Sequence, residues 1–147
     1  MTVNTRKNLM LFLTMLLTAS NAVPLRAAIS PVFRKEMQLT APERLKIKVK
    51  SVHVKEKKNP EYTACGVHVV AEILEVTHSA TGLKVGQEIV LVYGAMQYEV
   101  PVAGSAPLSV LRKGETTGAF LKFNKQAKWY EPFANHGCCL GDLIVVD

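Results

Sequence analysis

The sequence has few cysteines and lacks the motifs of the common enzyme classes. Its 147 residues include three cysteines and one tryptophan. No C-x-x-C pair, phosphate-binding loop, dinucleotide fingerprint or serine nucleophile motif is present. The carboxylates Glu72, Glu75, Glu99 and Asp142 are isolated, and no pair has a spacing that argues for acid–base catalysis. These absences favour a non-enzymatic protein over an enzyme.

Helical periodicity, heptads and internal repeats are also nearly absent after the first 22 residues. With 48% hydrophobic and 20% charged residues, the chain is not of the disordered class and can bury a core. Its length suits one domain. We therefore expect a single all-β domain.

The N-terminus predicts a secretory signal peptide. Arg6 and Lys7 precede an apolar run at residues 9–19, which is too short for a comfortable membrane span. Small residues follow, so we expect a signal peptide over residues 1–22, with cleavage there or as late as residue 28. The mature protein is then periplasmic or extracellular, without a stable membrane span. An uncleaved membrane anchor is the alternative.

The segment after the signal peptide predicts a leader followed by a strand. Residues 23–43 contain three prolines and no sustained period, which indicates an extended leader. The domain at 44–147 opens with strict alternation: Leu45, Ile47 and Val49 face one way, and Lys46, Lys48 and Lys50 face the other. The alternation changes phase at Ser51, which predicts a β-bulge there.

Further strands are expected from short apolar, β-branched runs bounded by turn residues. They are a long bent strand at 65–78 and shorter strands at 88–94, 96–104, 117–123 and 143–147, with a hairpin into 128–133 and one helical turn within 106–115. About five to six strands with almost no helix predict a small closed or partly open barrel. An OB-like fold is the preferred form.

The order of these elements also carries a resemblance. VVAEILEV is followed by LKVGQEIVLVY, PLSVLRKGETTGAFLKF and KWYEP, within residues 65–135. This order resembles small exported bacterial domains of the OB type. It is distantly similar to the barrels of tissue inhibitors of metalloproteinases (TIMPs) and netrin modules. Such inhibitors contact the metal of the protease through an N-terminal cysteine, and the expected mature N-terminus of this chain is not a cysteine. The resemblance therefore implies the fold alone.

The cysteines have two interpretations. In an oxidising compartment one disulfide is expected, and Cys65 with Cys138 or Cys139 is the natural pair because adjacent cysteines bridge poorly. The alternative is a metal or thiol-redox site, in which His136, Cys138 and Cys139 hold zinc or copper. The first interpretation implies no cofactor.

The candidate binding residues are Trp129, Tyr130 and the lysine row Lys46, Lys48 and Lys50. In a strand Trp129 and Tyr130 face opposite ways, so we expect one of them at the surface. Nucleic acid is not favoured as a partner, because few aromatic residues interleave with the lysines and exposed strand lysines also protect sheet edges. We therefore expect a binding or accessory module that contacts a protein or a cell-envelope component.

Overall fold

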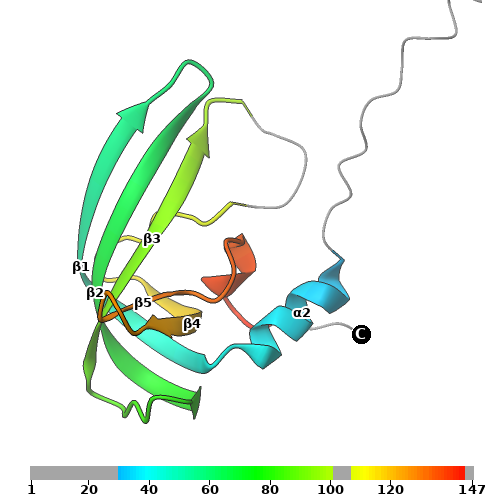
Figure 1. Ribbon diagram of the computed structural model, residues 1–147, viewed down its shortest axis with the longest axis vertical. Helices are drawn as coiled ribbons and strands as arrows, with labels where there is room; N and C mark the ends of the chain where they lie inside the picture. The colour runs from blue at the N-terminus through cyan, green and yellow to red at the C-terminus, as the bar shows by residue number, and fades with distance from the viewer. Residues whose placement is uncertain (1–29, 101–106, 145–147) are drawn as a thin grey trace, which may run out of the picture.

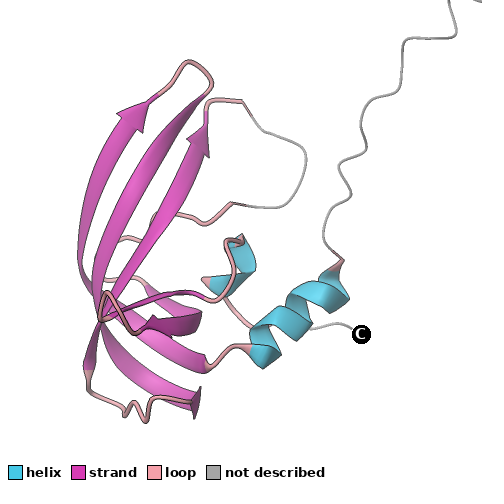
Figure 2. Ribbon diagram, in the orientation of Figure 1, coloured by secondary structure: helices cyan, strands magenta, loops and turns pink. Residues whose placement is uncertain are grey.

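Five strands form a closed barrel in the computed structural model, which describes residues 30–100 and 107–144 (Figures 1 and 2). The strand order around the barrel is β1-β2-β3-β5-β4. The strands are β1 (Glu43–Lys58), β2 (Tyr62–Ser79), β3 (Glu88–Tyr98), β4 (Thr116–Asn124) and β5 (Trp129–Pro132). The predicted all-β, OB-like barrel is confirmed. The predicted signal peptide lies outside the described residues.

The alternation of β1 is confirmed, and so is its bulge. Leu45, Ile47 and Val49 are buried, and the register with β2 shifts between Val49 and Ser51. Val52 and Val54 then pack against the core from the opposite sequence parity. The bulge lets one strand pair with β2 along its length while its first part, Glu43–Lys48, also pairs with β4.

The structure differs from the predicted strand breaks after β2. Residues 88–94 and the start of 96–104 form one unbroken strand, β3, whose last residue Tyr98 pairs with Tyr62. Residues 101–106 are not described. The other end of the chain also differs: Leu143 and Ile144 are not in a strand, and residues 145–147 lie outside the described part.

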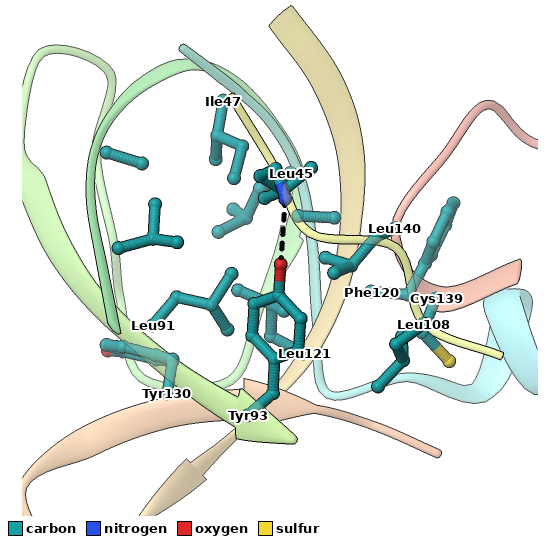
Figure 3. Close-up of a cluster of buried hydrophobic side chains, with 14 of the residues drawn as sticks. Leu45, Ile47, Leu91, Tyr93, Leu108, Phe120, Leu121, Tyr130, Cys139 and Leu140 are labelled. Atoms are coloured by element: carbon teal, nitrogen blue, oxygen red, sulfur yellow. Dashed lines mark hydrogen bonds between the residues drawn. The ribbon is translucent and has the colours of Figure 1, made fainter. Parts of the chain in front are cut away.

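The expected helical turn within 106–115 is absent over the described residues 107–115. Leu108 and Leu111 are nevertheless buried in the core. The Tyr93 hydroxyl accepts a hydrogen bond from the Leu111 amide at 3.1 Å (Figure 3). The same hydroxyl donates to the Ser109 carbonyl at 2.8 Å. These two bonds satisfy the Ser109 carbonyl and the Leu111 amide without a helix. The two leucines therefore lie in a loop and are buried against the core.

A helix, α2 (Pro31–Thr40), replaces part of the expected extended leader. Ser30 is its N-cap, because the serine Oγ accepts from the Phe33 amide at 3.2 Å. Pro31 occupies the first turn of the helix, where a backbone N–H would have no partner within the helix in any case. Within residues 30–100 and 107–144, no helix is long and apolar enough to cross a membrane.

Gln38 attaches α2 to the C-terminal segment. Its side chain is fully buried, and its Nε2 donates to the carbonyls of Cys138 at 2.6 Å and Asp142 at 3.0 Å. Its Oε1 accepts from the Ile144 amide at 2.8 Å. Helix α2 therefore lies beside the 3₁₀ turn η1 (Gly137–Cys139), as Figure 1 shows.

One hydrophobic core connects the barrel to these C-terminal residues. Leu91, Leu121 and Ile47 are fully buried within the barrel, and Phe120, Cys139 and Leu140 belong to the same cluster (Figure 3). Burying each large side chain contributes about 1.5–3 kcal/mol. The barrel interior is thus filled by side chains, which leaves its outer surface for binding.

Candidate functional site: the outer face of β2 and β3

The outward-facing residues of β2 and β3 form a mostly uncharged surface, here called the outer sheet face. It contains Ala64, Gly66, His68 and Val70 of β2 and Val90, Val92, Gly94 and Met96 of β3. Four pairs lie opposite each other in register: Ala64 with Met96, Gly66 with Gly94, His68 with Val92, and Val70 with Val90. Val90 and Met96 are 44% and 45% exposed, so this face presents apolar side chains to solvent.

The glycine pair leaves the backbone of this face open. A Cβ atom placed on Gly94 would meet nothing within 4 Å, and one on Gly66 would meet only the Lys55 carbonyl oxygen at 3.9 Å. Glycine inside a strand weakens the strand and is often found where a ligand or another backbone approaches closely. The opposed glycines of β2 and β3 therefore leave room for a ligand or another chain to approach the backbone.

Trp129 borders this face on one side. The centroid of its ring lies 6.3 Å from that of His68, and the ring planes meet at 68°. The indole Nε1 donates to Glu131 Oε1 at 3.1 Å, and the Asn124 side-chain amide donates to the same oxygen at 2.8 Å. These hydrogen bonds, from Asn124 first and Trp129 second, lower the pKa of Glu131. The tryptophan is therefore held in one orientation by an ionised carboxylate.

Two tyrosines lie at the far end of the same face. Tyr62 and Tyr98 pack with ring centroids 6.0 Å apart, and the Tyr98 hydroxyl lies 3.4 Å from the Met96 sulfur. Tyr98 is 41% exposed. Aromatic rings thus lie at one end of the outer sheet face and beside His68, with the glycine pair between them. The opposed carboxylates Glu72 and Glu88 follow Val70 and Val90 at the other end.

Of the two predicted aromatic contacts, Trp129 faces outward and Tyr130 does not. Tyr130 is 8% exposed, packs against Phe123 at 4.9 Å between ring centroids, and its hydroxyl bonds the Thr81 Oγ1 at 2.9 Å. Its place inside the barrel follows from strand alternation, because its backbone pairs with the buried Leu91. Tyr130 is a core residue in the structure, in contrast to its prediction as a contact residue.

The predicted lysine row is exposed, but it borders acidic residues. Lys46 lies opposite Glu75, and Lys48 lies opposite Glu72. Lys50 forms an ion pair with Glu72, and the hydrogen bond between them raises the pKa of Lys50 and lowers that of Glu72. Because the charges are balanced across the strands, this row is not a uniform cationic surface.

Two other lysines lie beside the outer sheet face. Lys55 is opposite Gly66, and Lys57 is opposite Ala64. The phase change at the bulge puts them on the outward parity, which is the sequence signal that identifies them. His68 had no comparable signal, since only the folded barrel brings Trp129 of β5 next to it.

The three cysteines are free and buried in the structure. Burial raises the pKa of Cys65 and Cys138, and it raises the pKa of Cys139 to about 11. The thiolate is the form that attacks electrophiles and binds metals. At neutral pH these residues are therefore neutral thiols within the core.

The expected disulfide of Cys65 is not formed, and the strand register explains why. Cys65 pairs with Glu56 of β1. Leu140, which directly follows the other two cysteines, bridges to Ala119, and Ala119 pairs with Leu45 of β1. Leu45 and Glu56 are roughly 35 Å apart along the strand at about 3.3 Å per residue, whereas a disulfide needs Cα atoms within about 7 Å.

His136 has a structural role in its own segment. Its Nδ1 accepts from the Cys138 amide at 3.1 Å, which caps the turn η1, and burial lowers its pKa. Cys139 Sγ accepts from the Ala134 amide at 3.3 Å. Within residues 30–100 and 107–144, no three His, Cys, Asp or Glu side chains are grouped to hold a metal ion.

The reactivity of the thiols tests this arrangement. We expect slow labelling of the native protein by a thiol reagent at pH 8, because raised pKa values and burial leave little accessible thiolate. After unfolding in denaturant without reductant, three labels per chain are expected in the intact mass. A single label would show that two cysteines are paired, contrary to the structure. The same spectrum identifies the mature N-terminus.

Comparison with known proteins returns no relative. No family model, curated protein or solved structure matches the chain.

Proposed function

We propose that the protein is an exported, non-enzymatic binding or accessory module, and that its outer sheet face contacts a protein or a cell-envelope component. The observation that carries this proposal is the orientation of Trp129. Its indole is held by Glu131 beside His68, at the border of a face that contains two opposed glycines. Barrels of the OB type bind ligands across strands 2 and 3, with the adjoining loops.

The Trp129 side chain is preorganised for contact by its hydrogen bond to Glu131. An aromatic side chain that is already fixed loses little conformational entropy when a ligand packs on it. Tyrosine and tryptophan are also the residue types most often found at the centre of protein contacts. Lys55 and Lys57 add positive charge beside the glycine pair, which favours partners with acidic groups.

The resemblance to TIMP and netrin barrels enters this proposal as a likeness of fold only. Protease inhibition is not part of it, since no cysteine stands at the expected mature N-terminus. The alternative function, metal or thiol-redox chemistry at His136, Cys138 and Cys139, has less support. The Nδ1 atom of His136 is occupied by a backbone bond, and both thiols are buried.

The single tryptophan makes a direct test possible. Trp129 is the only tryptophan in the chain, so its fluorescence reports on the outer sheet face alone. We expect saturable changes in emission when the mature protein is titrated with solubilised cell-envelope fractions, and loss of binding in Trp129→Ala. Loss of an aromatic anchor of this kind costs about 2 kcal/mol or more of binding free energy, which weakens binding by at least roughly thirtyfold.

A pull-down with the same fractions provides a second readout that does not need the indole. Phe33→Ala is the control, because Phe33 is an aromatic residue, 51% exposed, that lies on α2 and not beside the outer sheet face. The control should bind like the wild type. Equal binding by the Trp129→Ala and wild-type proteins in the pull-down would refute the proposed surface.

A further inference from the structure

A second candidate site lies outside the outer sheet face. It is a cavity of about 240 Å³ between the end of α2, the start of β1, the end of β2, β4 and the C-terminal segment. Its lining includes Leu39, Arg44, Lys46, Phe120, Asp142 and Leu143. The volume is below the 300–1,000 Å³ typical of sites for drug-sized molecules, so it fits a smaller ligand.

The polar side of the cavity contains Arg44, one nitrogen of which lacks a hydrogen-bond partner within the described part of the chain. Arg44 Nε is buried and has no hydrogen-bond partner among the described residues. An arginine side chain is a permanent cation with five N–H donors in a planar fork. A carboxylate offers two parallel acceptors that fit the guanidinium fork. Lys46, two residues along the same face of β1, adds a second positive charge.

The other side of the cavity is apolar and accessible. Leu39 and Leu143 are 45% and 48% exposed, and Phe120, which also lines the cavity, is 7% exposed. An apolar chain placed against these leucines would remove their surface from water, which is favourable. The cavity thus combines cationic side chains that can bind an anion with apolar side chains that can pack against a hydrocarbon chain.

The acidic residues of the lining limit the charge of the ligand. Glu75 and Asp142 both line the cavity, and Glu75 lies opposite Lys46 in register. Two carboxylates beside two cations disfavour a polyanion, because each further negative charge on the ligand would be repelled. A ligand with more than one negative charge is therefore a poor electrostatic match.

We propose that this cavity binds a small monocarboxylate with an apolar chain. Arg44 receives the carboxylate, Lys46 supports it, and the chain packs against Leu39 and Leu143. The site is independent of the proposed function, since Trp129 and the outer sheet face contribute no residue to it.

Titration with hexanoate and octanoate, followed by amide chemical shifts of the labelled mature protein, tests the proposal. We expect saturable shifts at millimolar concentrations or below for Leu39, Thr77 and Gly118, which line the cavity. Hexanol and octanol should bind at least tenfold more weakly, because they have no charge for Arg44 to meet. Equal binding of the alcohols, shifts that map elsewhere, or no saturation would overturn the proposal.

Variants separate the anchor from general effects on the fold. Arg44→Gln should weaken octanoate binding at least tenfold, whereas Arg112→Gln, which changes an exposed arginine outside this cavity, should not. Leu143→Ser changes an exposed residue without touching the core, and should also weaken binding of the longer carboxylate more than the shorter one. Unchanged affinity in both cavity variants would refute the site, while fluorescence of Trp129 tests the proposed function separately.

Discussion

Replacing Gly118 with alanine is expected to lower the free energy of unfolding by about 3 kcal/mol or more. A Cβ atom at this position would lie 2.2 Å from the Gly141 carbonyl oxygen and 3.1 Å from its carbonyl carbon. Both are backbone atoms, so no side chain can rotate away. The two glycines are also joined by a hydrogen bond of 3.0 Å from the Gly141 amide to the Gly118 carbonyl. The C-terminal segment must therefore move away from β4. Chemical denaturation measures the resulting loss in the free energy of unfolding.

Gly94→Ala is the matched control for this experiment. Gly94 is also inside a strand, but a Cβ atom there meets nothing within 4 Å. We expect a change within about 0.5 kcal/mol, or a small gain, because alanine restricts the unfolded chain more than glycine does. Equal effects of the two substitutions would mean that the close contact between Gly118 and Gly141 does not exist.

Gln38→Ala is expected to destabilise the junction of α2 and the C-terminal segment by about 3 kcal/mol. The substitution removes three hydrogen bonds and leaves the Cys138 carbonyl, the Asp142 carbonyl and the Ile144 amide without their partner. Buried groups that lose a partner incur most of the penalty, since water cannot replace it readily. Hydrogen exchange at the Ile144 amide should accelerate more than tenfold, and the midpoint of chemical denaturation should fall.

Glu36→Ala tests whether any change in α2 has the same effect. Glu36 is exposed and on the same helix, so its replacement should leave the Ile144 amide protected. If Gln38→Ala left exchange and stability unchanged, the attachment of α2 through this side chain would be refuted. Because Leu39 and Leu143 lie on the two segments that Gln38 joins, the same variant should also weaken octanoate binding to the proposed cavity.

The patterns that the sequence predicts well are those that depend on neighbouring residues alone. Strand alternation has a period of two, so the burial of Leu45, Ile47 and Val49 and the bulge before Ser51 follow directly from the order of residues. The hairpin of β4 and β5 follows from two β-rich runs around a short polar turn. The helix α2 could also have been predicted, because serine followed by proline is a recognised helix start. The three prolines of this segment favoured an extended interpretation instead.

The candidate site was predicted only in part, for a reason of distance in the chain. Alternation correctly places one of Trp129 and Tyr130 at the surface, but it cannot decide which one. The pairing of β5 with β3 decides it, by placing Tyr130 beside the buried Leu91. The same closure brings Trp129 to His68, sixty-one residues earlier in the chain.

The sequence by itself determined the alternation of the first strand, the outward lysines and the presence of three cysteines, since each is a property of residue type and local order. Tertiary structure alone decided what these residues do. It paired the lysine row with Glu72 and Glu75, separated Cys65 from Cys138 and Cys139, and placed an arginine donor without a partner in a cavity. These outcomes depend on the register of strands and on the closure of the barrel, which are set by packing among residues far apart in the chain.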